Sequence, residues 1–285
     1  MQGQRRSLLR KVLSQQAKYS TPVAVQRGTA APPRMLLVLL MRHGESTANA
    51  TREDLPDPEL TALGQRQADA WRARTRTWAL ETVLVSPLLR TIQTAARAFG
   101  GHEGASWRLC PAAREHWWHM VQSRGRLASH LVPLLEELPA NGLEKAAVED
   151  AIGLPSEHWD PDVEAAASKR ELGRRSARAT LALATDLARR ADRGEKRVVV
   201  VCHWGVISAL TDVDANNCDV VGLLFSPHAE DPTAPAKEER RNCYKSAVKE
   251  LGWTYDVLGP WNATSPKIPC LETTAAPPRA PSDGP

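Results

Sequence analysis

An arginine and a histidine, Arg42 and His43, stand directly behind an apolar run at positions 35–41. Seven apolar residues in a row predict a strand buried on both faces, as in a parallel sheet. Gly44 follows, and a glycine just past such a strand lets the backbone turn tightly and approach a ligand. Ligands of open α/β sheets bind at the carboxyl ends of the strands. The pair therefore predicts an anion-binding group and a nucleophile at one place.

Further polar residues follow predicted strands in the same way. The segment 86–90, which ends in Arg90, follows a short apolar strand, and Glu115 follows a third candidate strand. His203 comes directly after a run of valines that ends in Cys202. Because the carboxyl ends of parallel strands lie along one edge of a sheet, we expect these groups to meet there.

Two histidines, two arginines and a carboxyl group form a set suited to phosphoryl transfer. A neutral histidine nitrogen is a competent nucleophile toward phosphorus. Arginine forks match phosphate oxygens and stabilise the charge of the transition state. A carboxylic acid can protonate the leaving oxygen. A metal hydrolase is disfavoured, because no two histidines stand four residues apart with a carboxylate between them.

The elements that must position these groups alternate between strands and helices. Apolar runs predict strands at 35–41, 81–85, 107–110, 198–201 and 219–225. Periodic segments predict helices at 61–76, 86–99 and 162–193. Thr61 and Ser86 are the expected N-caps of the first two, with Pro87 at the first helical position. The alternation predicts an α/β fold, a three-layer α/β/α sandwich with a mostly parallel central sheet.

We expect one domain at 35–258, with an inserted lid at about 115–165. Residues 1–34 carry seven basic and no acidic side chains. They are interpreted either as a disordered basic arm or as a transit-like segment for a plastid or mitochondrion. The proline-rich segment 259–285 is expected to be a disordered tail.

The composition is that of an ordinary globular protein, and a formal net charge of +4 gives no argument for a nucleic-acid partner. The sequence holds no stretch long enough to span a membrane. Five scattered cysteines without a CxxC pair favour a reducing compartment. We expect an intracellular protein, cytoplasmic or organellar, that acts on a small phosphorylated substrate or a phosphoprotein. The oligomeric state stays open.

The motifs together resemble the histidine phosphatase superfamily, also called phosphoglycerate mutase-like. The resemblance spans about 35–225 and rests on motifs in the expected order, each at the end of a predicted strand. The matching segments are Arg42-His43-Gly44-Glu45-Ser46 with Asn49, Leu60-Thr61 with Gly64 and Gln67-Ala68, Ser86-Pro87-Leu88-Leu89-Arg90-Thr91-Ile92-Gln93-Thr94-Ala95, and Val200-Val201-Cys202-His203 with Gly205.

The resemblance implies a role for each of these residues. His43 would accept the phosphoryl group as a phosphohistidine, and Glu115 would be the proton donor and later the base that activates water. No metal and no cofactor would be needed, because the arginines neutralise the charge. The residues that would bind the phosphate oxygens are Arg42, Arg90, His203, Asn49 and Trp204, the last through its backbone N–H.

The chain departs from the family pattern at three places. Trp204 stands where the family most often has glycine, and its large ring is expected to narrow or shape the pocket. The residues at 116–119, His-Trp-Trp-His, differ from the stretch that positions a sugar acid in the mutases. The segment between Val206 and Cys218 is short for the family, so the edge of the sheet is expected to be trimmed.

Three functions are therefore weighed. A phosphatase that hydrolyses phosphomonoesters through His43 is preferred. A phosphoglycerate mutase-type phosphotransferase is the alternative among enzymes, and the residues after Glu115 count against it. A catalytically inactive phosphate-binding or scaffold module is the third interpretation, supported by Trp204 and the unusual neighbours of Glu115.

Overall fold

The computed structural model describes residues 35–102, 104–116, 119–124, 167–228, 243–265 and 268. All of them belong to one compact unit, Pro33–Pro285. The predicted basic arm at 1–34 lies outside the described residues. So do Trp117, Trp118, most of the predicted lid and most of the predicted tail.

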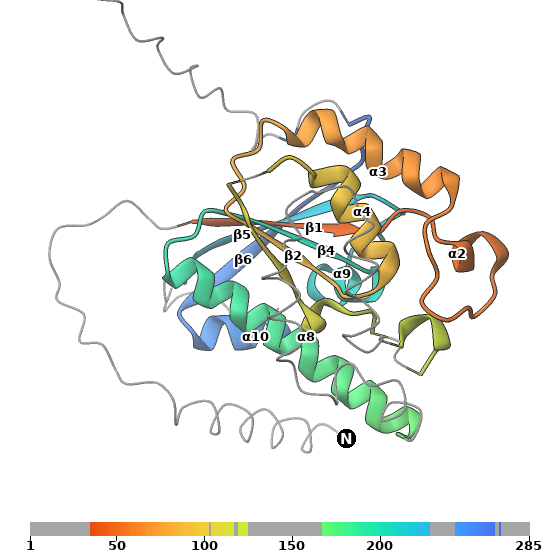
Figure 1. The fold of residues 1–285 in the computed structure, drawn as a ribbon. Coiled ribbons are helices and arrows are strands. Elements are labelled where there is room, and N and C mark those ends of the chain that lie inside the picture. Colours follow the sequence, from red (N-terminus) through yellow and green to blue (C-terminus); the bar gives the residue numbers. More distant parts are fainter. Residues whose placement is uncertain are drawn as a thin grey trace, which may run out of the picture. The chain divides into compact units, whose positions relative to one another are not determined.

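A six-stranded sheet forms the centre of the fold, in the order β3-β2-β4-β1-β5-β6 (Figure 1). The strands are β1 Leu36–Arg42, β2 Thr82–Val85, β3 Ser106–Leu109, β4 Arg197–Cys202, β5 Val220–Pro227 and β6 Trp253–Trp261. The pairings among β3, β2, β4 and β1 are parallel, and the pairings of β5 with β1 and with β6 are antiparallel. The predicted mostly parallel sheet is confirmed, and the trimming of its edge relative to the family stays a prediction.

Helices cover both faces of the sheet. They are α2 Thr47–Thr51, α3 Ala62–Thr75, α4 Leu89–Phe99, α8 Lys169–Asp192, α9 Trp204–Thr211 and α10 Cys243–Glu250, with short 3-10 turns η2 Pro111–Ala113 and η3 Val121–Ser123. In Figure 1, α3 and α4 lie on one face, and α8, α9 and α10 on the other. The predicted three-layer sandwich is therefore confirmed.

The alternation of side chains along β1 builds both halves of the core. Its odd-numbered residues, 37–41, pack with the apolar side chains of α3 and α4. Its even-numbered residues, 36–40, pack with those of α8, α9 and α10. Such burial stabilises the fold by about 1.5–3 kcal/mol for each large apolar side chain. It also fixes the position of β1 along the sheet, and therefore the position of Arg42 at the carboxyl end of the strand.

The helix starts agree only in part with the sequence patterns. Thr61 caps α3 as predicted, because its hydroxyl accepts a hydrogen bond from the Gly64 N–H at 3.0 Å. The prediction that Ser86 caps the second helix is wrong. That helix, α4, begins at Leu89, whose N–H donates to Asp57 Oδ1 at 2.8 Å. The Ser86 hydroxyl instead bonds to His203, a contact that the local sequence does not encode.

The chain holds more regular structure near its C-terminus than expected. Strand β6 runs to Trp261, and the side chain of Ile268 is buried in the core, so the ordered fold continues past the predicted boundary at 258. Trp253 and Tyr255 are buried while their neighbours are exposed, the alternation of an edge strand. Pro260 is tolerated there, because an edge strand does not need every N–H for pairing.

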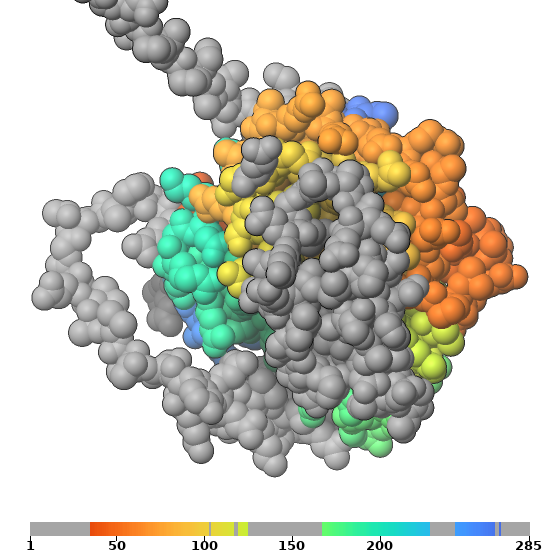
Figure 2. All heavy atoms as spheres, in the orientation of Figure 1, coloured from red at the N-terminus to blue at the C-terminus, as the bar shows by residue number. Residues whose placement is uncertain are grey.

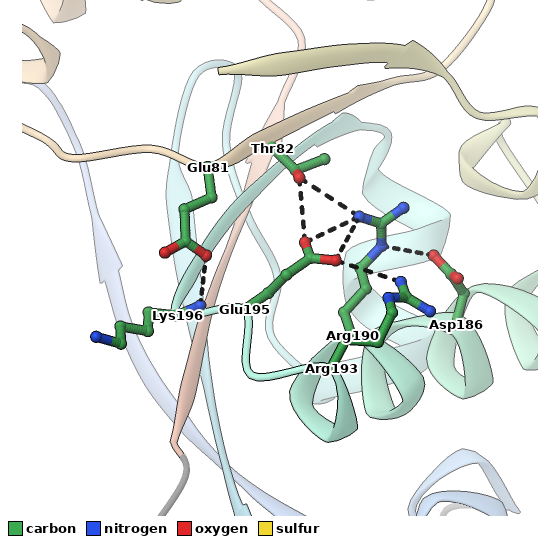
Figure 3. A network of polar contacts seen from close by, with 7 residues as sticks. All are labelled: Glu81, Thr82, Asp186, Arg190, Arg193, Glu195 and Lys196. Carbon is green, nitrogen blue, oxygen red and sulfur yellow. Dashed lines mark hydrogen bonds and ion pairs between the residues drawn. The ribbon is translucent and has the colours of Figure 1, made fainter. Parts of the chain in front are cut away.

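A polar network fastens α8 to the amino-terminal edge of the sheet, where β2 and β4 begin (Figure 3). Arg190, 9% exposed, donates to Asp186 at 2.7 Å, to Glu195 at 3.0 Å and to Thr82 at 3.4 Å. Arg193 reaches the same Glu195 carboxylate at 3.3 Å from a more exposed position. Burial opposes the charge of Arg190, but the hydrogen bonds and charges of Asp186 and Glu195 raise its pKa.

We expect Arg190→Met to lower the free energy of unfolding by about 1–3 kcal/mol, because two carboxylates lose their shared buried partner. Urea titration at neutral pH measures this change. Arg193→Met is the matched control, since the Arg193 side chain is about half exposed and its guanidinium bonds only to Glu195 among the described residues. Its cost is expected to stay below about 0.5–1 kcal/mol. Equal losses for the two variants would contradict the assignment of Arg190 as the central residue.

Candidate active site

The register of the sheet brings the ends of β1, β2 and β4 to one edge. Met41 of β1 and Val85 of β2 both pair with Val201 of β4. The next residues continue this alignment: the His43 N–H donates to the Cys202 carbonyl at 3.1 Å, and the Ser86 N–H to the Val201 carbonyl at 2.9 Å. The residues that follow the three strands are therefore neighbours in space, as the sequence predicts.

His43 is buried, with 3% of its surface exposed. Its Nδ1–H donates to the Gly44 carbonyl at 2.7 Å, and this bond places the lone pair on Nε2. The Arg90 Nε–H donates to that Nε2 at 3.3 Å. Burial, followed by the charges of Arg90 and Arg42, holds the pKa of His43 well below its usual value. The ring is a neutral imidazole whose Nε2 lone pair accepts the Arg90 Nε–H.

His203, which is fully buried, lies beside His43, with 5.1 Å between the ring centroids. Its Nε2 bonds to the Ser86 hydroxyl at 2.7 Å, and its Nδ1 has no hydrogen-bond partner among the described residues. Burial and the neighbouring charges, Arg90 first among them, hold its pKa well below the usual value. A neutral ring bonded this way can present an Nδ1–H to an added acceptor.

Arg42 and Arg90 approach the histidines from different elements. Arg42 donates from Nη1 to the Ala215 carbonyl at 2.7 Å, while its buried Nε has no partner within the described part of the chain. Arg90, only 2% exposed, donates from Nη1 to the Gln122 carbonyl at 2.8 Å. Burial lowers the pKa of Arg90 to about 10, so it stays charged near neutral pH. Buried donors without partners are costly unless a ligand satisfies them, and an anion would do so.

Glu115 docks on the first turn of α9. Its Oε1 accepts the N–H of Gly205 at 3.0 Å and the N–H of His116 at 2.7 Å. A Cβ at position 205 would overlap this carboxylate, so glycine is needed there for Glu115 to reach the helix. Burial raises the pKa of Glu115, although the two N–H bonds and the charges of Arg90 and Arg42 oppose the shift. The protonated form of Glu115 is therefore more stable, relative to the carboxylate, than it would be in water.

Asn49 and Trp204 are held by the loop at 214–218. Asn49 Oδ1 accepts the Ser46 N–H at 3.2 Å, which completes the cap of α2, and it also accepts from Asn217 at 3.3 Å. The indole of Trp204 donates to Asp214 at 2.6 Å. These contacts orient both side chains toward the loop, and binding of phosphate by either residue stays a prediction.

The sequence analysis did not assign several residues that lie at the site. Ser86 touches His203 where a helix cap was expected. Arg114 is 1% exposed and is near enough to lower the pKa of Arg90 and of His203. Its position directly before Glu115 is the one signal that could have indicated it. Asn217 donates to the His43 carbonyl at 3.0 Å across a long sequence separation, which no local pattern indicates.

His116, the residue directly after Glu115, contributes less to the site than its type suggests. His116 turns away, and its Nε2 bonds to the Thr180 hydroxyl on α8. Burial lowers the pKa of His116 to about 4, so the ring is neutral at physiological pH. A half-buried neutral histidine bonded to a helix hydroxyl fits a packing role, and contact of His116 with substrate finds no support in this arrangement.

The fold and the site define the class of protein: a three-layer α/β protein whose cationic, histidine-containing site lies at the carboxyl edge of the sheet. The sequence model of the histidine phosphatase superfamily (branch 1) matches residues 38–213, which is more than half of the chain. The chain therefore belongs to the histidine phosphatase superfamily.

Curated relatives match over limited segments. A phosphoglycerate mutase-like protein of Arabidopsis thaliana is 41% identical over 83 residues, which are 25% of this chain and 31% of that protein. A probable phosphoglycerate mutase of Yersinia enterocolitica is 44% identical over 63 residues, 21% of this chain and 29% of the relative. The matched segments thus span about a third of the relatives' length or less.

The solved structures to which this chain is similar share less of its sequence. The ecdysone phosphate phosphatase of the silkworm Bombix mori, solved with tungstate, is 17% identical with a TM-score of 0.46, over 82% of this chain and 95% of that chain. A phosphoglycerate mutase of Bacillus anthracis is 17% identical with a TM-score of 0.43, over 77% and 97%.

None of the helices in the described ranges is both long and apolar enough to cross a membrane. Within the same ranges, no three His, Cys, Asp or Glu residues come together as they would around a metal ion.

Proposed function

We propose that this protein hydrolyses phosphomonoesters through a phosphohistidine on His43. The observation that carries the proposal is the orientation of the His43 ring. The Gly44 carbonyl fixes the proton on Nδ1, and the lone pair of Nε2 accepts the N–H of the buried Arg90 guanidinium. A neutral imidazole nitrogen beside fixed cations combines a nucleophile with the charges that attract its substrate.

In the first proposed step, His43 Nε2 forms a bond to phosphorus while the bond from phosphorus to the ester oxygen breaks. The leaving alkoxide takes a proton from Glu115, and we assign that proton to Oε2 because Oε1 already accepts two backbone N–H groups. In the second step, water attacks phosphorus and gives a proton to the Glu115 carboxylate. The nitrogen–phosphorus bond breaks, and inorganic phosphate leaves with both residues restored.

The charge on the transferred group would be neutralised by the side chains around it. Arg42 Nε and His203 Nδ1 are buried and have no partner among the described residues, so each can donate to a phosphate oxygen. Arg90 adds a guanidinium that remains charged near neutral pH. Such preorganised donors do the work that a metal ion does in other phosphatases, and we expect turnover in the presence of a chelator.

A mutase-type transfer is the second candidate, because the curated relatives that match this chain carry that name. The same phosphohistidine serves both reactions, and the difference is whether water or a second hydroxyl of the substrate accepts the phosphoryl group. The substrate is proposed to be a small phosphorylated molecule or a phosphoprotein, in the cytoplasm or an organelle.

The proposal is tested with the purified full chain, a nitrophenyl phosphate and a panel of sugar phosphates, nucleotides and phosphopeptides, all with EDTA. We expect release of inorganic phosphate and a trapped phosphoenzyme that is labile to acid and stable to alkali. Isomerised product with a bisphosphate primer and no free phosphate would favour the mutase. Tight vanadate binding without turnover on the whole panel would favour an inactive module and overturn the proposal.

A further inference from the structure

The short turn η3, Val121–Ser123, is held on its outer side by one exposed carboxylate. Asp54 lies in the loop between α2 and α3. Its Oδ2 accepts the Val121 N–H at 2.9 Å, and its Oδ1 accepts the Gln122 N–H at 2.8 Å. Figure 2 shows the segment 119–124 adjoining the loop that follows α2 at the surface. One side chain therefore fixes the two first amide groups of the turn.

The carbonyl groups of the same turn face the candidate active site. The Gln122 carbonyl accepts from Arg90 Nη1 at 2.8 Å, and the Ser123 carbonyl accepts from Arg114 Nη2 at 2.6 Å. Both arginines are at most 2% exposed. Arg90 in turn donates from Nε to His43 Nε2 at 3.3 Å. A continuous path of hydrogen bonds thus leads from Asp54 on the surface to the buried histidine.

We infer that Asp54 is a positioning residue for the phosphate site, acting through η3 on the guanidinium of Arg90. The Gln122 residue offers its N–H to the Asp54 carboxylate and its carbonyl to the Arg90 guanidinium, so one residue of η3 joins the surface anion to the buried cation. The backbone of Arg90 is fixed from the same loop, because Asp57 accepts the N–H of Leu89 at 2.8 Å. The loop at 52–57 therefore holds the start of α4 through Asp57 and the head group of Arg90 through Asp54 and η3.

The consequence is a requirement for anion binding that lies outside the site itself. Without the Asp54 carboxylate, the two N–H groups of η3 lose their acceptors and bond to water instead. The turn can then shift. The Arg90 head group then loses a fixed partner, and a misplaced guanidinium binds phosphate less well. The inference rests on the proposed function only in that it takes Arg90 as an anion ligand.

The experiment measures the Kd of inorganic phosphate by calorimetry, and KM and kcat for nitrophenyl phosphate, in the full chain. For Asp54→Ala we expect Kd and KM to rise about fivefold, the size of losing one capping side chain, with a smaller change in kcat. Asp54→Glu is expected to restore at least half of the loss on a logarithmic scale. Glu53→Ala, at an exposed neighbour whose side chain makes no hydrogen bond within the described part of the chain, is the matched control with an expected change below about 1.5-fold.

A double-mutant cycle separates positioning from general stability. In an Arg90→Lys background, whose lysine cannot bridge the turn and the anion as a fork does, Asp54→Ala should change Kd by less than about twofold. The same factor in both backgrounds, or an unchanged Kd in Asp54→Ala, would overturn the inference.

The binding readout does not need turnover. A protein that binds phosphate and hydrolyses nothing would defeat the proposed function alone, while a normal Kd in an active Asp54→Ala variant would defeat this inference alone.

Discussion

His43→Ala is expected to lower kcat for nitrophenyl phosphate by about 10⁴-fold or more, because the variant has no atom that can accept the phosphoryl group. The cations around the site remain, so binding of phosphate or vanadate should change far less than turnover. The trapped phosphoenzyme is expected to disappear completely. Single-turnover quench experiments with labelled substrate measure the rate of hydrolysis and the amount of phosphoenzyme.

The matched control for this variant is His102→Ala. His102 is a half-buried histidine in the turn after α4, where its ring packs against Phe99. Its replacement is expected to leave kcat within about twofold, since it touches none of the reacting groups. Equal turnover by His43→Ala and the wild type, with both folded by circular dichroism, would remove His43 as the nucleophile.

The position of the site could be predicted because it depends on strand ends. The apolar runs fix where β1, β2 and β4 lie, and parallel pairing aligns their carboxyl ends at one edge. Residues directly behind those runs, such as His43 and His203, have no freedom to lie elsewhere. Their ring-to-ring distance of 5.1 Å follows from this alignment.

The polar contacts inside the site could not be predicted, because each joins segments far apart in the sequence. Ser86 followed by proline has the local pattern of a helix cap, yet its hydroxyl bonds to His203, 117 residues away in the chain. The helix start is satisfied by Asp57, which lies in another loop. The preference of Ser86 for capping a helix is therefore overridden here, because the buried His203 ring needs a hydrogen-bond partner.

The missed C-terminal elements have a different cause. The alternation of buried and exposed residues in β6 is short, and Gly259 and Pro260 within it are typical of a loop. The strand forms because it pairs with β5 along most of its length. Tertiary pairing of this kind is invisible to a sequence pattern, and the predicted tail boundary was placed too early for that reason.

Glu115→Gln is expected to separate good from poor leaving groups. For an alkyl phosphate, whose alkoxide must be protonated as it leaves, kcat should fall by about 10²–10⁴-fold. For nitrophenyl phosphate, whose leaving group is stable as an anion, the loss in the first step should be much smaller. Glutamine keeps an oxygen that can accept from the Gly205 N–H, so the packing on α9 is preserved.

The pH dependence follows from the directions of the pKa shifts. The pKa of His43 is well below its usual value, so its nucleophilic form persists as the pH falls through the mildly acidic range. The pKa of Glu115 is raised, so its proton is retained to a higher pH than for a carboxyl group in water and is then lost. With an alkyl phosphate, kcat is expected to be highest on the acidic side of neutrality and to decline as Glu115 ionises.

The side-chain amide introduced by Glu115→Gln cannot ionise, so this substitution should abolish that decline in kcat as well as lowering its maximum. Glu171→Gln, on the half-exposed start of α8, is the control and should keep the wild-type profile. The same fractional loss in the rate of phosphoenzyme formation on alkyl and aryl phosphates, or an unaltered decline in the variant, would show that another group donates the proton. The backbone N–H groups around Glu115 donate hydrogen bonds but are too weakly acidic to transfer a proton, so such a donor would be another side chain or a water molecule.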